Sequence, residues 1–280
     1  MFLSQLRGEL RKLFARRRTY LGYVVFIVFE VLILTLWVKV GREKVAELAE
    51  RNLIPMDQLY SSLTSTYWIM GGGMFLLGSI YFALVGGDIV AKESEDGNLR
   101  MVLSRPVSRL RVLLLKYFAV IIYTVTFVIF VGITGYGMSV LALGTGGGLC
   151  VWNPNLYILS VYPGWGEGFT RLFVGACFMG LSMCVVSSLA FFFSCFKMKP
   201  AAATIMALSV FFIDFVLQNM PFLRGVKHVF ITYRMENWAY LLQEEIPWAR
   251  IVESYAILSG LNISLFIVGW MVFQSRDFKT

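Results

Sequence analysis

Apolar residues occur along the chain in six long runs that are separated by shorter polar segments. Each run is close to the ~20 residues that an α-helix needs to cross the hydrocarbon core of a bilayer. Because lipid offers the backbone no hydrogen-bond partners, such a continuous run must form a helix, whereas barrel strands would alternate apolar and polar positions. The pattern predicts an all-α polytopic membrane protein. We expect a single transmembrane domain of residues 1–280, with spans at about 20–39, 67–90, 113–143, 170–196, 200–220 and 254–275.

Residues 1–18, before the first span, follow a different pattern. Their apolar side chains recur every three to four positions and their basic side chains occupy the rest of the helical wheel; the apolar set is Phe2, Leu3, Leu6, Leu10, Leu13 and Phe14. This pattern predicts an amphipathic helix along the cytoplasmic interface, with its basic residues against anionic lipid. A cleaved secretory signal is not expected, because the apolar run that follows is too long and no A-x-A site follows it.

The composition is unlike that of a soluble domain, and the distribution of charge predicts the orientation in the membrane. Of the 280 residues, 58% are apolar and 15% are charged, and the mean hydropathy is +0.71, far from the balance of an ordinary soluble domain. The net charge of +8 comes mainly from Lys and Arg in the segments that six spans place on the side of the termini. The positive-inside rule therefore predicts that both termini are cytoplasmic, and it explains the charge without a nucleic-acid partner.

The segments on the opposite side differ from one another. Residues 40–66 mix charges evenly, which predicts a short amphipathic helix with a turn at Pro55. Residues 144–168 carry several Gly and Pro turn signals and are expected to form a loop. Residues 224–253 contain several Trp and Tyr residues, typical of a segment that lies in, or re-enters, the outer interface.

The sequence contains no familiar pattern of catalytic or metal-binding residues. It lacks the G-x-x-x-x-G-K-[ST] phosphate loop, its four cysteines lack zinc spacing, and His228 is the single histidine. We therefore expect neither enzymatic activity nor a cofactor or metal bound by this chain. The glycines at 71–73, with Gly78, predict close approach of a neighbouring helix.

Two acidic residues lie within the predicted spans. Glu30 is near the middle of the first span and Asp214 is about two-thirds along the fifth. A charged, unpaired carboxylate in the bilayer costs about 3 kcal/mol on insertion scales. The residues either belong to a translocation path or dimer seam, or are hydrogen-bonded inside the bundle for packing alone. The sequence leaves both readings open.

The cytoplasmic loop at residues 91–112 has the most specific pattern. Gly97 permits a turn, Leu99 and Leu103 mark one turn of an amphipathic helix, Pro106 ends it and Ser108 can cap the following span. A short helix held between two spans acts as a rigid lever, because a force on it moves both spans.

This loop resembles that of permease subunits of the ABC-2 family of ATP-binding-cassette transporters, whose pattern is roughly E-x-x-x-G-T-L-x-x-L-L-S-x-P-V-S-R followed by a Lys inside the next span. The matching residues are Glu93, Gly97, Leu99, Leu103, Ser104, Pro106, Val107, Ser108, Arg109 and Lys116. Asn98 replaces the usual Thr, and Val102 replaces a Leu. The basic amphipathic start and the six spans extend the resemblance more loosely over the whole chain.

The resemblance implies an export permease in a bacterial-type plasma membrane, whose loop docks on a separate ATPase subunit. ATP and Mg²⁺ would belong to that ATPase, and the chain would pair with a second permease, either a copy of itself or a paralogue. It leaves the substrate unidentified. The alternative is a stand-alone secondary transporter or channel, which would have ion sites and paired helix breaks within the membrane. An integral-membrane enzyme is disfavoured, because no catalytic group of residues can be assembled.

Overall fold

The computed structural model describes residues 2–52, 55–99 and 107–276. The described chain is mostly helical, and six helices are long and apolar enough to cross a membrane: Thr19–Gly41, Ser62–Glu95, Arg109–Leu143, Trp165–Ser194, Pro200–Gln218 and Trp248–Ser275. Each coincides with one predicted span. The protein is therefore a polytopic helical membrane protein.

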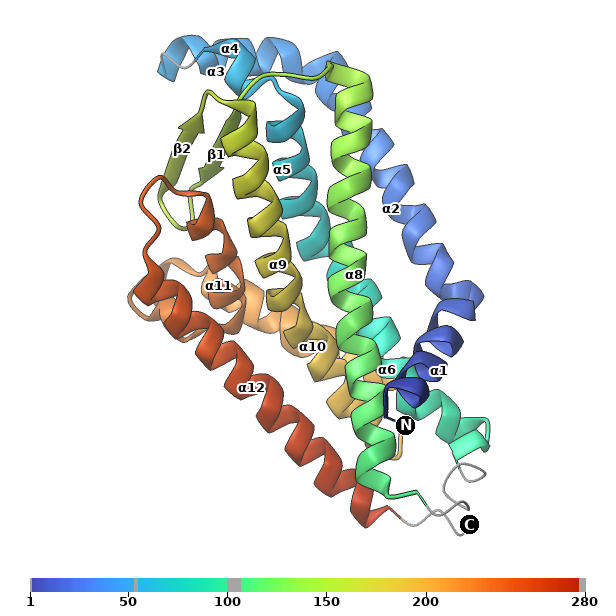
Figure 1. Cartoon of the computed structure of the whole chain (residues 1–280). Helices are drawn as coiled ribbons and strands as arrows, with labels where there is room; N and C mark the ends of the chain where they lie inside the picture. Colours follow the sequence, from blue (N-terminus) through green and yellow to red (C-terminus); the bar gives the residue numbers. More distant parts are fainter. Residues whose placement is uncertain (1, 53–54, 100–106, 277–280) are drawn as a thin grey trace.

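The elements follow one another in the order seen in Figure 1. They are α1 (Phe2–Ala15), α2 (Arg17–Leu36), η1 (Trp37–Gly41), α3 (Arg42–Asn52), α4 (Met56–Leu59), α5 (Ser62–Gly73), η2 (Met74–Gly78), α6 (Ser79–Glu95), α8 (Arg109–Leu143), β1 (Leu149–Asn153), β2 (Ile158–Tyr162), α9 (Trp165–Ser194), α10 (Pro200–Gln218), η3 (Pro221–Val229), α11 (Ile231–Met235), η4 (Glu236–Leu242) and α12 (Trp248–Ser275). The segments η1 and η2 are π-helical, and η3 and η4 are 3₁₀-helical.

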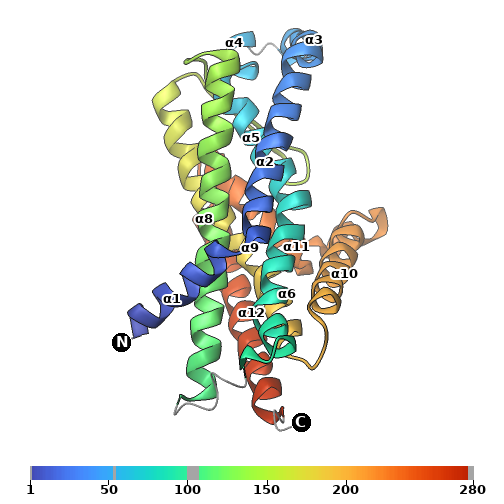
Figure 2. The same cartoon turned by 90° about the vertical axis from the view of Figure 1, so that its right-hand side faces the viewer.

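The bundle has two distinct ends (Figures 1 and 2). One end, which we call the loop end, holds α1, the end of α6, the start of α8 and the end of α12. The opposite end, which we call the hairpin end, holds α3, α4 and the two strands. The predicted amphipathic helix and turn at residues 40–66 correspond to α3 and to Pro55, which precedes α4.

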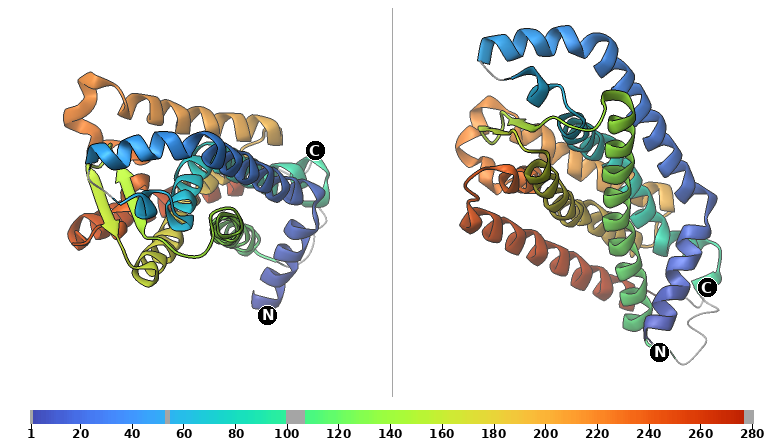
Figure 3. Two further views of the ribbon diagram at one scale, coloured as in Figure 1. Left: turned by 90° about the horizontal axis from the view of Figure 1, so that it is seen from above. Right: turned by 45° about the horizontal axis from the view of Figure 1, so that its top comes forward.

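The centre of the bundle is α9, which packs against α6, α8, α10 and α12 (Figure 3). The backbones of α6 and α9 touch at Gly86, where a Cβ atom would lie 2.6 Å from the carbonyl oxygen of Ser187. At Gly87 a Cβ atom would meet the hydroxyl of Thr204 on α10 at 2.6 Å. Small residues allow this close packing in the absence of a hydrophobic driving force, and they fix α6 between two neighbours.

The second span is longer at both ends than the sequence pattern predicted. Ser61 caps α5 by accepting a hydrogen bond from the amide of Thr64, and Thr64 in turn accepts one from the amide of Cys150 in β1 at 2.9 Å. These hydroxyl groups replace water, so the polar start of the helix is buried. At the other end, helix continues to Glu95 and α8 already starts at Arg109, so the predicted loop of residues 91–112 is shortened to 96–108.

The predicted loop at residues 144–168 contains a β-hairpin, which is a correction to a purely α-helical fold. Strands β1 and β2 pair antiparallel, with Leu149 opposite Tyr162 and Asn153 opposite Ile158. The side chain of Asn153 accepts hydrogen bonds from the amides of Asn155 and Leu156, which forms the turn. The strands are short and carry no clear two-residue period, so the sequence showed the turn and missed the strands.

Helix α1 packs its apolar stripe on α8. Leu13 is buried, and the Phe14 ring lies 5.8 Å from that of Tyr123. Leu3 departs from the predicted stripe, because 77% of it is exposed. Figure 2 shows α1 crossing α8 at a steep angle and projecting beyond it, and its position at the cytoplasmic interface stays a prediction.

Candidate functional site

A buried ion pair joins α6 to α8 at the loop end. The Lys116 ammonium lies 2.5 Å from one carboxylate oxygen of Glu93, and the two residues are only 2% and 7% exposed. Lys116 also binds a carboxylate oxygen of Glu9, on α1, at 3.2 Å. Buried charges of this kind are tolerated when they are paired and hydrogen-bonded. One lysine thus ties together three helices.

Two further basic residues extend this group. Lys12 binds Glu9 at 2.7 Å, and Arg16 lies 3.5 Å from Glu93. Burial alone would raise the pKa of Glu9, but the charges and hydrogen bonds of Lys116 and Lys12 outweigh it and hold that pKa below its usual value. We call Glu9, Lys12, Arg16, Glu93 and Lys116 the charged cluster.

The turn after α6 follows the predicted pattern as far as the described residues reach. Gly97 has a φ of 73°, in the left-handed region that favours glycine. Leu99 is buried, as expected for an apolar residue facing the bundle. Three residues assigned to this loop, Leu103, Ser104 and Pro106, lie outside the described residues.

The return into α8 is anchored to the end of α12. Ser108 caps α8 by accepting a hydrogen bond from the amide of Arg111, as predicted. The guanidinium of Arg109 donates to the carbonyl oxygens of Gln274 and Arg276 at 2.8 and 3.0 Å. Arg276 then donates to the Ser94 hydroxyl at 2.9 Å. The loop is therefore bound to α12 on both of its sides.

Glu30 is fully buried between α2 and α8. One carboxylate oxygen accepts a hydrogen bond from the hydroxyl of Thr134 at 2.9 Å, and Gly135 leaves room for the carboxyl group. The other oxygen has no hydrogen-bond partner among the described residues. Glu30 thus faces the bundle, and its role in a translocation path stays a prediction.

Asp214 has a structural partner that the sequence did not reveal. Its carboxylate accepts hydrogen bonds from the amide of Ile231 at 3.3 Å and from the amide and hydroxyl of Thr232 at 2.7 and 2.6 Å. These amides belong to the first turn of α11, where backbone N–H groups have no partner within the helix. The geometry gives Asp214 the role of a capping residue supplied by α10.

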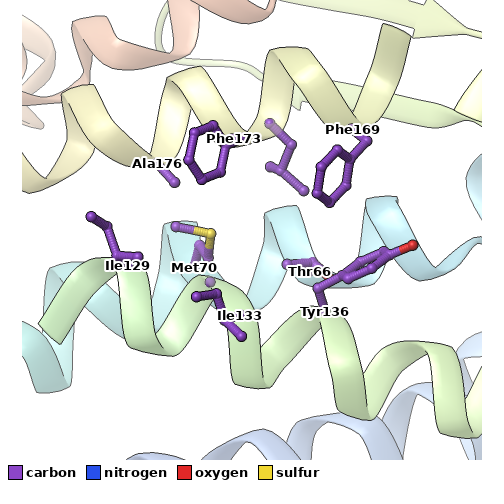
Figure 4. A pocket seen from close by; sticks show the side chains of 10 residues that line it. Thr66, Met70, Ile129, Ile133, Tyr136, Phe169, Phe173 and Ala176 are labelled. Atoms are coloured by element: carbon purple, nitrogen blue, oxygen red, sulfur yellow. The ribbon is translucent and has the colours of Figure 1, made fainter. Parts of the chain in front are cut away.

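The bundle contains an apolar cavity of about 190 Å³ between α5, α8 and α9 (Figure 4). Met70, Ile133 and Phe173 point into it, and Thr66 and Tyr136 supply its few polar atoms. No ionisable side chain lines this cavity apart from the Tyr136 phenol. It fits an apolar group and offers no chemistry.

A second cavity, of about 350 Å³, lies between α5, η2, α9, α10, η4 and the hairpin. The sequence predicted that the glycines at 71–73 allow a neighbouring helix to approach closely. Gly73 packs against the Phe29 ring, as predicted, whereas Gly71 and Gly72 meet no side chain and line the cavity. Sequence reasoning missed this site, because its residues come from distant segments.

Within the described ranges, no group of three or more His, Cys, Asp or Glu residues could hold a metal ion. All four cysteines are free thiols. The described residues thus provide a charged cluster at one end and an aromatic cavity toward the other.

A family model of a protein of unknown function, DUF2705, matches residues 51–279. The chain belongs to the DUF2705 family. No curated protein matches its sequence. The DUF2705 match includes α6, α8 and α12, which form the loop end, and the residues that line the second cavity. Glu9, Lys12 and Arg16 of the charged cluster lie before the matched range.

Proposed function

We propose that this protein is the transmembrane permease subunit of an ABC-2-type ATP-binding-cassette transporter, which couples ATP hydrolysis by a separate ATPase subunit to the export of a substrate. In this proposal the loop end faces the cytoplasm of a bacterial-type plasma membrane, and a second permease completes the transmembrane part. The chain itself binds neither ATP nor Mg²⁺.

The observation that carries the proposal is the attachment of the α6–α8 turn. The motif residues Glu93 and Lys116 form one ion pair, and Arg109 is bound to the end of α12. These contacts fix the described residues on both sides of the turn to the helices. A displacement that an ATPase imposes on this turn would therefore move α6 and α8 together. Coupling between an ATPase and a transport pathway requires such a link.

The path from the turn to the rest of the bundle is continuous. Helix α6 runs through the π-helical η2 into α5, so one span links Glu93 to the second cavity. Segments of π-helix within α-helices occur frequently at functional sites. ATP binding can shift such a span only if the ATPase fits the turn differently in two states.

The exposed surface of the turn defines where an ATPase would bind. Glu95, Asp96 and Asn98 are exposed, whereas Glu93 and Leu99 are buried. We therefore assign recognition to the exposed residues and positioning to the buried ones. This refines the set expected from the sequence.

Photo-crosslinking in the native membrane tests the proposal. A photoreactive amino acid replaces Asn98, and a matched control carries it at Thr145, which is exposed near the hairpin end. We expect Asn98 to capture a protein that contains the G-x-x-x-x-G-K-[ST] phosphate loop, and Thr145 to capture none. Capture of no such ATPase at Asn98 contradicts the proposal.

Charge reversal at the anchor gives a second test. Arg109→Glu places a carboxylate against the carbonyl oxygens of α12, so we expect the ATPase to co-purify poorly while the chain still inserts. Arg171→Glu is the matched control, since Arg171 donates to the carbonyl oxygens of Leu241 and Gln243 far from the loop. Equal ATPase yields from both variants would argue against docking here.

Reconstitution of the purified chain distinguishes the proposed permease from a stand-alone secondary transporter or channel. The purified chain, without an ATPase, is placed in proteoliposomes under an ion gradient. We expect no transport. Uptake driven by the gradient alone would identify a stand-alone secondary transporter or channel.

A further inference from the structure

The second cavity, lined by Tyr67, Trp68, Trp152, Trp238 and Glu236 among others, has aromatic walls. The ring centroids of Trp68 and Trp152 are 6.1 Å apart, and those of Tyr67 and Trp238 are 5.9 Å apart. Faces of aromatic rings carry partial negative charge, which attracts a cation within ~6 Å of the ring centroid. We call this site the aromatic cavity.

One end of the aromatic cavity is acidic. The carboxylate of Glu236 accepts hydrogen bonds from the side-chain amide of Asn155 at 3.2 and 3.5 Å and from that of Gln218 at 3.4 Å. These contacts are long, and two carboxylate oxygens offer about four acceptor sites. No Lys or Arg of the described residues forms an ion pair with Glu236, although the charge of Lys227 acts on this carboxylate from beyond ion-pair distance.

An unused acceptor lies beside this carboxylate. Among the described residues, the side-chain oxygen of Gln218, which lies outside the cavity lining, has no hydrogen-bond partner, although Gln218 is only 3% exposed. A buried acceptor without a donor costs about 1–3 kcal/mol. A purely structural role for Glu236, holding the hairpin turn and α10 to η4, explains the Asn155 and Gln218 contacts but leaves other acceptor sites of the carboxylate unused.

The floor of the cavity is open. No atom lies within 4 Å of the position that a Cβ atom would occupy at Gly71 or Gly72. The volume of about 350 Å³ falls in the range of small-molecule sites, which combine apolar walls with a few convergent polar groups.

We infer that the aromatic cavity binds an organic cation, with an ammonium or guanidinium group against Glu236 and an apolar body packed against the aromatic walls. Such a ligand supplies a positive charge at ion-pair distance and N–H donors for the unused acceptor sites of the Glu236 carboxylate. An anion is repelled by the carboxylate, and a neutral molecule leaves the charge unpaired. The apolar cavity of Figure 4 has no carboxylate and does not share this preference.

Binding of the cation requires no ATPase, so the inference is independent of the proposed function. The test uses three probes with the same ring system and different charge: 1-naphthylmethylammonium, neutral 1-naphthalenemethanol and anionic 1-naphthylacetate. Equilibrium dialysis measures their binding to the full chain in phosphatidylcholine nanodiscs, whose net neutral surface does not concentrate a cation. We expect saturable binding of the ammonium compound, weaker binding of the alcohol and none of the anion.

Variants locate the binding. Glu236→Gln keeps the shape of the side chain and removes its charge, which should weaken ammonium binding about tenfold or more, as expected for a hydrogen bond to a charged group. Trp152→Ala should weaken binding of both the ammonium and the alcohol. The matched controls are Glu167→Gln and Trp165→Ala, because both residues are exposed at the start of α9 and lie outside the cavity. These controls should bind like the wild type.

Gly72→Leu tests the cavity without changing Glu236 or its hydrogen-bond partners. Gly72→Leu fills the cavity from an open position and should abolish binding, whereas Gly260→Leu, equally open and on α12, should not. Equal wild-type affinity for the ammonium compound and the alcohol overturns the inference without any variant. Unchanged ammonium binding in Glu236→Gln or in Gly72→Leu also overturns it.

Discussion

The charged cluster holds two acidic side chains and the aromatic cavity one, all largely shielded from solvent, but the two sites balance the negative charge differently. In the charged cluster, Glu9 and Glu93 share Lys116. In the aromatic cavity, Glu236 accepts hydrogen bonds from two side-chain amides but has no ion-pair partner among the described residues, and burial raises the pKa of this carboxyl group against the effect of those amides and of the more distant Lys227. An acid that is paired with a lysine holds helices together. An acid without such a pair can bind a ligand that brings its own positive charge.

Loss of the shared lysine should have the largest effect. Lys116→Met leaves Glu93 and Glu9 buried without their main partner, which should lower the free energy of unfolding by about 3–5 kcal/mol. Titration with SDS in mixed micelles measures this change. Lys39→Met, at an exposed position near the hairpin end, is the control and should have little effect.

The triple variant Glu9→Gln, Glu93→Gln, Lys116→Met distinguishes charge balance from packing. It removes all three charges together and should recover most of the lost stability, because no charge remains unpaired. If the single and triple variants are equally unstable, packing of the lysine chain dominates, and the balance of charge is not what stabilises the charged cluster.

Asp214 should have the next largest effect, because its partners are backbone amides. Asp214→Ala leaves the amides of Ile231 and Thr232 without their acceptor, at a cost of about 1–3 kcal/mol. Asp214→Asn retains one acceptor oxygen and should lose less. Unfolding in mixed micelles measures both variants.

The same variants test whether Asp214 belongs to the capping site or to a ligand site. Binding of 1-naphthylmethylammonium to Asp214→Asn should match that of the wild type. A loss of binding at unchanged stability would instead place Asp214 on a ligand path, as one of the two readings of the sequence held.

Gly97 tests the turn without changing any charge. Valine at a φ of 73° introduces backbone strain of about 1–2 kcal/mol, so Gly97→Val should distort the turn and reduce co-purification of the ATPase. Gly144→Val is the control: its φ of 85° is also positive and its surroundings are open, but it lies near the hairpin end.

The outcome separates general destabilisation from loss of docking. Gly144→Val should lose at least as much stability in mixed micelles, because its φ of 85° and ψ of 173° lie in a region that is almost restricted to glycine, and only Gly97→Val should lose the ATPase. Parallel loss of the ATPase in both would mean that the turn has no special part in docking.

The six spans could be predicted because the bilayer leaves a long apolar run only one structure. The motif pair Glu93 and Lys116 could also be identified, but their contact depends on how α6 and α8 pack, which one sequence does not encode locally. Glu9 was not singled out, because an acid in an amphipathic helix looks like part of a solvated face until that helix packs on α8.

The aromatic cavity could not be predicted for the same reason. Tyr67, Trp152 and Trp238 come from three distant segments, and each looks like an interfacial aromatic residue by itself. The cap on α11 was hidden too, since Asp214 and Thr232 lie on either side of η3. Local patterns identify elements, whereas shared partners between elements appear only once the chain is folded.

The smallest expected effect is the pH dependence that distinguishes the two kinds of acid. Because the pKa of Glu9 is lowered in the folded state, its contribution to stability is complete above the pKa of the unfolded chain and is lost as the pH falls through the folded value. The pKa of Glu236 is raised by burial, so its contribution has the opposite sign: it is complete at low pH and is lost as the pH rises through its folded value. Glu9→Gln should therefore flatten the acid side of the stability profile and Glu236→Gln the side toward neutral pH, measured by unfolding in mixed micelles from pH 4 to pH 8.

The control is Glu47→Gln, which alters an exposed pair with Arg51 on α3 and should leave both sides of the profile unchanged. Flattening of the same side by Glu9→Gln and Glu236→Gln would mean that the two acids are compensated alike, and the contrast between the charged cluster and the aromatic cavity would be lost.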